Sequence, residues 1–117
     1  MTHKIIVCTD RNLTWEALNR FAEAGPVTLE RVASLHELAA RQELVIDAVV
    51  VDDRFLPIIA QVERSARRHS AIYRDAVFMT AGEALNALWT GPLAGMDDMP
   101  VRQLAEWVAV GRMQSAA

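Results

Sequence analysis

The sequence predicts an α/β domain in which helices cover both faces of a parallel sheet of about five strands. Short apolar runs alternate along the chain with amphipathic stretches at helical spacing, an order that favours parallel strands joined by right-handed crossovers. The segment 46–51 (IDAVVV) carries consecutive apolar residues, which is typical of a strand covered on both sides. A length of 117 residues is enough for one domain, which we expect to span residues 1–117.

The first part of the chain is predicted to form two strands and two helices. In order, these are a strand at 3–8, a helix at 14–24, a strand at 27–32 and a helix from Ser34 to about Glu43. Gly25 and Pro26 form a stop signal for the first helix. Ser34, with Glu37 three residues later, forms a capping box that opens the second helix.

The rest of the chain continues the alternation less regularly. We expect a strand at 46–51, a helix beginning near Pro57, a strand at 75–80, one or two helical turns within 83–88, a short strand at 87–90, and a helix from Pro100 to about Met113. The helix near Pro57 is expected to expose Arg64, Arg67 and Arg68 and to bury Leu56, Ile59, Val62 and Ala66. The last helix is expected to bury Val101, Leu104, Ala105 and Val108, and residues 114–117 to fray.

Composition excludes several classes of function. The 12 basic and 15 acidic residues give a net charge of -3, which provides no basic patch for nucleic acid. No apolar run approaches the roughly 20 residues of a membrane span, and the first residues lack a secretory signal, so we expect a cytoplasmic protein without membrane contact. The single cysteine, Cys8, rules out an internal disulfide and a cysteine-based zinc site.

Polar residues follow three of the predicted strands at their carboxyl ends, where open parallel sheets bind ligands. In chain order, these residues are Thr9 and Asp10, then Asp52 and Asp53, then Thr80. Carboxylates held close together need a cation to offset their repulsion, and oxygen ligands of this kind suit Mg²⁺. An alternative with equal weight is that Asp and Thr stand there only because loops and helix caps favour them.

At these positions the sequence resembles the receiver domain of two-component response regulators, over about residues 4–110. That family ends its third strand in a phosphoacceptor aspartate, and the stretch IDAVVVDDRFLP implies Asp52 for this role, with Asp53 as the alternative. The resemblance further implies Asp10 and Asp52 as Mg²⁺ ligands and Thr80, followed by Ala81, as the switch hydroxyl. It implies a flavodoxin-like (CheY-like) doubly wound parallel sheet of five strands.

The sequence departs from that family at three points. Thr9 replaces one acid of the metal-binding pair, and the fourth helix is expected to be shortened or missing. Receivers also carry a lysine after the fifth strand, whereas this chain has Gly91 before Pro92 and a single lysine, Lys4. Such a lysine contributes charge-assisted hydrogen bonds to an aspartyl phosphate. We therefore expect an atypical receiver, or pseudo-receiver, that is not an enzyme and signals through protein contacts without ordinary phosphorylation.

The resemblance also implies a kind of partner. Receivers commonly dimerise through the fourth helix, fifth strand and last helix, which implies a homodimer and an interaction surface containing Trp89, Leu93 and Trp107. A histidine kinase or an effector protein is the other partner that the resemblance implies. An arginine side chain beside Asp10 and Asp52, in place of a metal ion, would favour a permanently set scaffold.

Three other functions stay open on the sequence alone. The first is a phosphorylatable receiver that uses Asp52 with Mg²⁺. The second is a small phosphocarrier or enzyme that uses Cys8 or the carboxylate edge, and the third is a localisation or assembly module. Cys8 ends the first strand, but the following TDRNLT has no glycine to cradle a phosphate, which favours a buried structural thiol. The three histidines show no metal-ligand spacing, and they are His3, His36 and His69.

Overall fold

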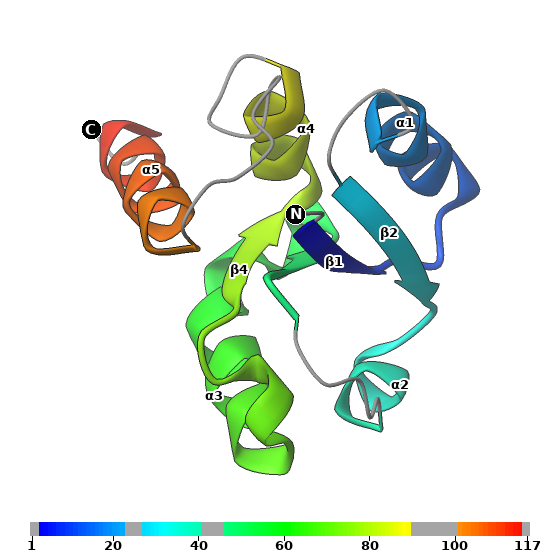
Figure 1. Ribbon diagram of the computed structural model, residues 1–117, viewed down its shortest axis with the longest axis vertical. Helices are drawn as coiled ribbons and strands as arrows, with labels where there is room; N and C mark the ends of the chain where they lie inside the picture. The colour runs from blue at the N-terminus through cyan, green and yellow to red at the C-terminus, as the bar shows by residue number, and fades with distance from the viewer. Residues whose placement is uncertain (1–2, 23–26, 41–45, 90–100, 116–117) are drawn as a thin grey trace.

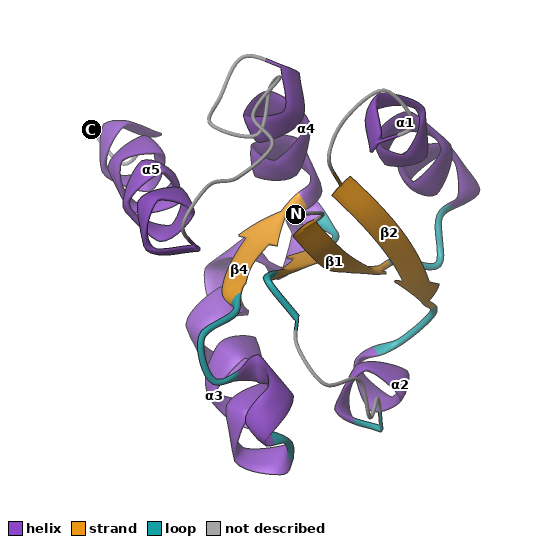
Figure 2. Cartoon of the chain, in the orientation of Figure 1, coloured by secondary structure: helices purple, strands orange, loops and turns teal. Residues whose placement is uncertain are grey.

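The structure is a computed structural model that describes residues 3–22, 27–40, 46–89 and 101–115. Its centre is a sheet of four parallel strands in the order β2-β1-β3-β4 (Figures 1 and 2). The strands are β1 (His3–Cys8), β2 (Val27–Val32), β3 (Ala48–Val51) and β4 (Val77–Thr80). This order, in which the chain moves outward on one side of β1 and then on the other, is consistent with a flavodoxin-like sheet, although four strands are described and not five.

Five α-helices connect or follow the strands. They are α1 (Asn12–Ala22), α2 (Leu35–Ala39), α3 (Ile59–His69), α4 (Ala81–Trp89) and α5 (Val101–Ser115). Two short 3-10 helices flank α3, namely η1 (Asp53–Ile58) and η2 (Ala71–Tyr73). The predicted α/β class with helices on both faces is therefore confirmed.

The sheet separates two apolar cores, because alternate residues of each strand point to opposite faces. One core joins Ile5, Val7, Val50 and Met79 to the helices α1, α4 and α5, which lie together in the upper part of Figure 1. The other core joins strand residues of the opposite face to α2 and α3, in the lower part of Figure 1. Its residues include Ile6, Val49, Val51, Ile59, Val62, Tyr73 and Phe78. All four residues of β3 are buried, as its continuous apolar run predicts.

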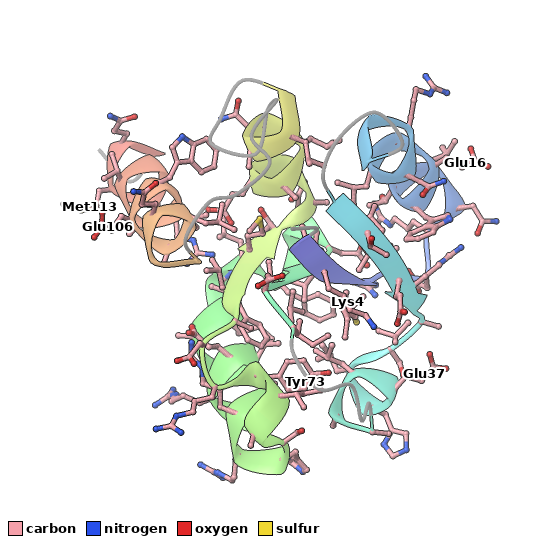
Figure 3. The ribbon with its side chains drawn as sticks, in the orientation of Figure 1. Lys4, Glu16, Glu37, Tyr73, Glu106 and Met113 are labelled. Carbon is pink, nitrogen blue, oxygen red and sulfur yellow. The ribbon has the colours of Figure 1, made fainter. Side chains whose placement is uncertain are left out.

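Local contacts confirm Ser34 as the N-cap of α2, while the Glu37 carboxylate reaches back to the residue before Ser34. The Ser34 hydroxyl accepts the backbone N–H of Glu37 at 3.2 Å, while the Glu37 carboxylate accepts the N–H of Ala33 at 2.7 Å. Tyr73 is wholly buried and points toward α2, where its hydroxyl donates to the carbonyl oxygen of Leu38 (Figure 3). The helix α2 ends at Ala39, and the rest of its predicted length lies outside the described residues.

The predicted strand at 87–90 is wrong, and the sheet has four strands in the described part of the chain instead of five. Residues 87–89 complete the helix α4, which is nine residues long and is therefore not missing. The physical reason is the spacing of Ala84 and Ala87, which are both buried on one face of the helix three residues apart. Thr90 lies outside the described residues.

The helix faces were predicted with two errors. Leu56 is 47 % exposed, because Pro57 stands inside η1 and α3 begins only at Ile59. Ala105 is exposed, although Leu104 and Val108 of the same helix are buried as predicted. The helix α5 continues to Ser115, so the predicted frayed tail is helical at residues 114 and 115, and residues 116 and 117 lie outside the described residues. The side chain of Val101 also lies outside the description.

No helix in the described parts of the chain combines the length and the apolar character needed to span a bilayer.

Candidate functional site

Three strands bring their carboxyl ends to one edge of the sheet. The parallel register sets Cys8 beside Val51 and Val51 beside Thr80, so β1, β3 and β4 end level with one another. Thr9 and Asp52 directly follow the first two of these strands. Thr9, Asp52 and Thr80 are the buried polar residues of the described core, with exposed fractions of 1 %, 4 % and 3 %. The polar residues predicted to share an edge therefore do share it.

The hydroxyl of Thr9 holds the carboxylate of Asp52. It donates to Asp52 Oδ1 over 2.6 Å, and its oxygen accepts the backbone N–H of Arg11 at 3.0 Å. The loop that carries Thr9 is tied down in turn, because Arg31 Nε donates to the carbonyl oxygen of Thr9 at 3.2 Å. A short bond from a buried hydroxyl to a carboxylate is among the stronger neutral-to-charged contacts in proteins. Thr9 therefore positions one oxygen of Asp52 from inside the molecule.

The guanidinium of Arg54 lies between two acids of the site. Its Nη2 is 3.7 Å from Asp10 Oδ1 and 3.6 Å from Asp52 Oδ2. Asp52 Oδ2 is buried and has no hydrogen-bond partner, so its contact with Arg54 is an ion pair longer than a hydrogen bond. The guanidinium also lies over the ring of Phe55, 4.9 Å from the ring centroid, which restricts its position.

The Mg²⁺ ion that the receiver resemblance implies does not fit this arrangement. Mg²⁺ requires octahedral oxygen coordination, whereas Asp10 and Asp52 both face a guanidinium nitrogen that repels a second cation. Within the part of the chain that the structure describes, no group of three or more His, Cys, Asp or Glu side chains is placed to hold a metal ion. A divalent cation would have to displace Arg54 to reach the two acids.

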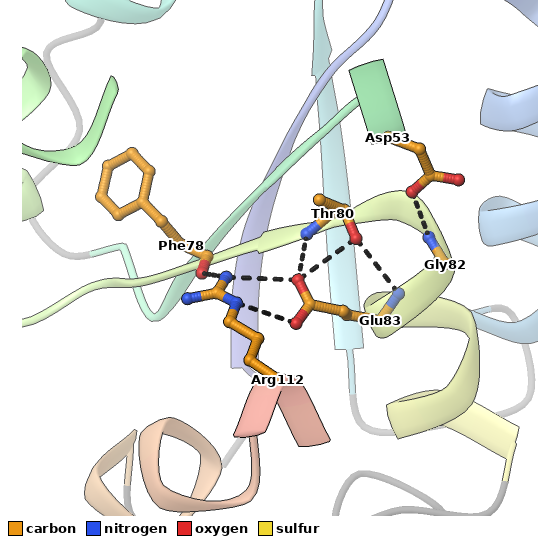
Figure 4. Close-up of polar contacts among 6 residues, drawn as sticks. All are labelled: Asp53, Phe78, Thr80, Gly82, Glu83 and Arg112. Carbon is orange, nitrogen blue, oxygen red and sulfur yellow. Dashed lines mark hydrogen bonds and ion pairs between the residues drawn. The ribbon is translucent and has the colours of Figure 1, made fainter. Parts of the chain in front are cut away.

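Thr80 and Asp53 make hydrogen bonds to the first residues of α4 (Figure 4). The backbone N–H and the hydroxyl of Thr80 lie 2.9 and 3.1 Å from Glu83 Oε1, which is the contact expected of an N-cap and its third following residue. Asp53 Oδ1 accepts the N–H of Gly82 at 3.0 Å. The capping alternative is thus the geometry seen at these two residues. The role of Thr80 as a switch hydroxyl, and of Asp53 as an alternative acceptor, stays a prediction.

The chain's lysine is remote from the site. Lys4 is the second residue of β1, at the amino end of the strands, and its Nζ pairs with Glu30 Oε1 at 3.2 Å. Asp52 follows the carboxyl end of β3. Because β1 and β3 are parallel, these two positions lie toward opposite ends of the sheet. Lys4 is therefore not placed to contact a group on Asp52.

Cys8 is buried at the end of β1, with an exposed fraction of 3 %. Burial, and to a smaller extent the neighbouring carboxylate of Asp52, raise the pKa of its thiol to about 11. The thiol is therefore protonated at neutral pH, whereas a nucleophilic cysteine needs the thiolate. This environment is that of a structural thiol and does not favour the phosphocarrier alternative.

The buried thiol makes stability depend on pH above pH 9. In the unfolded chain the thiol ionises near 9.0, while the folded chain keeps its proton until about pH 11. Unfolding therefore releases a proton between these values, and the free energy of unfolding falls by at most about 1.4 kcal/mol per pH unit as pH rises. Urea unfolding of the wild type and of Cys8→Ala from pH 8 to pH 11 measures this contribution. A parallel decline in both proteins would contradict it.

The predicted interaction surface is only partly visible. Trp107 is half-buried, packs against the core beneath α5 and lines a groove of about 940 Å³ between α5, α4 and η1. Leu93 and the side chain of Trp89 lie outside the described residues. Large apolar side chains are exposed around the same groove, among them Leu56, Val110 and Met113, the last at 75 % and labelled on α5 in Figure 3.

Sequence reasoning missed three charged residues of this edge: Arg54, Glu83 and Arg112. Arg54 directly follows the two aspartates 52 and 53, and this nearness to the acids was the available signal. The four residues from Thr80 to Glu83 (TAGE) match a capping box and could have identified Glu83. Arg112 had no signal, because its partner Glu83 lies 29 positions earlier and meets it only in the folded chain.

Comparison of the chain with models of protein families, with curated proteins and with solved structures finds no significant match.

Proposed function

We propose that this domain is an atypical, receiver-like signalling module that acts by binding other proteins and does not accept a phosphoryl group at Asp52 in ordinary use. The fold supports the first part of this proposal. The strand order β2-β1-β3-β4 with helices on both faces is an arrangement that binds ligands at the carboxyl edge of the sheet. Asp52 stands at that edge, directly after the central strand β3.

The observation that carries the proposal is the position of Arg54. Its guanidinium is within ion-pair distance of both Asp10 and Asp52, so the site already contains a cation supplied by its own chain. Phosphorylation would add negative charge at Asp52. In the family that the sequence resembles, a metal ion and a lysine offset this charge. Among the described residues, no cluster of His, Cys, Asp or Glu is placed to hold a metal ion, and Lys4 pairs with Glu30.

The proposal is tested by prolonged incubation with a small-molecule phosphodonor and Mg²⁺, followed by intact-mass measurement. We expect no phosphoryl adduct on the wild type. The matched control is Asp52→Asn, which keeps the size of the side chain and removes the acceptor. Stoichiometric modification of the wild type that is absent from Asp52→Asn would overturn the proposal.

A second candidate function, a phosphorylatable receiver, has one observation in its favour. Asp52 Oδ2 has no hydrogen-bond partner, so its lone pairs would be free to attack a phosphodonor once Arg54, 3.6 Å away, has uncovered this buried oxygen. The side chain of Arg54 is 52 % exposed and has room to move aside. The mass measurement on the wild type separates this candidate from the first.

The partner of the proposed module is a protein, either a second copy of the chain or an effector. Exposed Val110 and Met113 on α5 give that helix an apolar outer surface beside the groove. Sedimentation velocity over a range of concentrations distinguishes a homodimer from a monomer that awaits a different protein.

A further inference from the structure

We propose that the outer edge of β4 is a docking site for an extended segment of a partner protein, which adds to the sheet as a parallel strand. In the free protein this edge is occupied by the ion pair between Glu83 and Arg112, and the added strand would displace that pair. The inference goes beyond the proposed function, because it depends on the edge of the sheet and holds whether or not Asp52 is phosphorylated. In the described part of the chain, β4 pairs with β3 and with no strand on its other side.

The alternation of the strand decides which backbone groups point outward. The N–H of Val77 donates to the carbonyl oxygen of Asp47 at 3.1 Å, so the backbone groups of Val77 face β3. Because successive residues of a strand face opposite sides of the ladder, the groups of Phe78 and Thr80 face outward. Unpaired groups of this kind are a template for another strand.

The Glu83–Arg112 pair occupies two of these groups. Arg112 Nη2 donates to the carbonyl oxygen of Phe78 at 2.8 Å, and Glu83 Oε1 accepts the N–H of Thr80 at 2.9 Å (Figure 4). The two side chains bond to each other, with Arg112 Nε 2.9 Å from Glu83 Oε2. The pair therefore presents one donor to Phe78 and one acceptor to Thr80.

A residue of a parallel neighbouring strand would present the same two groups. In a parallel ladder, one residue donates its N–H to the residue before its opposite number and accepts the N–H of the residue after it. The residue opposite Met79 would thus bond to the Phe78 oxygen and to the Thr80 N–H. In an antiparallel ladder two different residues of the added strand would meet these two groups, so the pair by itself marks an edge that can accept a strand, and the all-parallel sheet favours the parallel direction.

The pair is a replaceable occupant of this edge. The side chains of Arg112 and Glu83 are 34 % and 20 % exposed, so water and salt reach and weaken the pair, although its two-point contact makes it stronger than a single surface ion pair. An added strand would satisfy the same backbone groups, and both charged side chains reach solvent when they turn outward. Exchange therefore keeps both backbone groups paired, and its cost is the bond from the buried Thr80 hydroxyl to Glu83 Oε1.

The groove that contains the Glu83–Arg112 pair supplies sites for the side chains of the added strand. It is lined by apolar residues from both sides, among them Leu56 and Ile59 near the start of α3 and Trp107 and Val108 on α5, and it includes Glu83 and Arg112 themselves. An extended segment directs alternate side chains to opposite faces, so its side chains reach both walls. A helix offers no free backbone N–H and C=O along its length, which makes an extended peptide the occupant that matches both features.

The test uses an octapeptide of residues 46–53 (IDAVVVDD) with blocked ends as the probe, because this sequence already pairs in parallel with β4 from the other side. Nuclear magnetic resonance follows the backbone amide of Thr80 and the Nε of Arg112 during titration of the wild type. We expect saturable shifts of both signals, and binding at least about threefold tighter to Arg112→Gln, which leaves the Phe78 oxygen free.

Two N-methylated peptides provide the control. One peptide is methylated at the backbone nitrogens of Ala48 and Val50, and the other at those of Val49 and Val51. An added strand donates backbone N–H groups to β4 from alternate residues only, so we expect one of the two peptides to lose binding and the other to keep it. Equal binding by both, the absence of a shift at Thr80, or shifts confined to the other edge strand, β2, would overturn the proposal. Self-association of Arg112→Gln in place of peptide binding would overturn it in favour of a second copy. The wild-type titration decides the matter alone if that variant does not fold.

Discussion

Replacing Thr9 with valine is expected to lower the free energy of unfolding by about 2–3 kcal/mol, although the two side chains have nearly the same shape. The hydroxyl of Thr9 donates to Asp52 Oδ1 over 2.6 Å, and the other carboxylate oxygen has no hydrogen-bond partner. Valine cannot donate a hydrogen bond, so the Asp52 carboxylate, which is 4 % exposed, would lose its short bond to residue 9. Urea unfolding at neutral pH measures the loss.

A double-mutant cycle separates this contact from packing. In an Asp52→Ala background, Thr9→Val should cost less than about 1 kcal/mol, because the carboxylate that needs the hydroxyl is gone. Thr28→Val is the matched control, since Thr28 is exposed on β2 and its replacement should change stability by about 0.5 kcal/mol or less. An equal cost of Thr9→Val in both backgrounds would show that Thr9 acts by packing and does not hold Asp52.

Replacing Arg54 with alanine is expected to make stability depend on Mg²⁺. The substitution removes the guanidinium that lies 3.7 Å from Asp10 and 3.6 Å from Asp52, at a cost of up to about 1 kcal/mol for a partly exposed ion pair. The two acids then lack a cation. Mg²⁺ at ten times its dissociation constant would stabilise the variant by about 1.4 kcal/mol, which raises the melting temperature by about 5 °C.

Thermal unfolding followed by circular dichroism, with and without Mg²⁺ at matched ionic strength, measures this effect. The wild type and Arg54→Lys should show no specific shift, because each keeps a cation between the acids. Arg64→Ala removes an exposed arginine from α3 and controls for the change in net charge. If Mg²⁺ raises the melting temperature of the wild type as much as that of Arg54→Ala, Arg54 does not take the place of a metal ion.

The order of elements and the position of the acids could be predicted from the sequence. The apolar run AVVV at residues 48–51 predicts a buried strand, because these residues leave no polar face to turn toward water. Parallel strands joined by helices have their carboxyl ends at one edge, so the grouping of Thr9 and Asp52 followed from connectivity alone. The capping box at Ser34 and Glu37 is equally local, since its partners are three residues apart.

Two features could be decided only by tertiary structure. Residues 87–89 were expected in a strand, but the burial of Ala84 and Ala87 in the core that α4 shares with the sheet places them in a helix. Two arginines of this region pair with acids that are far from them in the sequence. Arg54 lies beside Asp10, and Arg112 lies beside Glu83. Long charged side chains have many rotamers of similar energy, and which partner each one meets depends on where the fold brings the opposite charge.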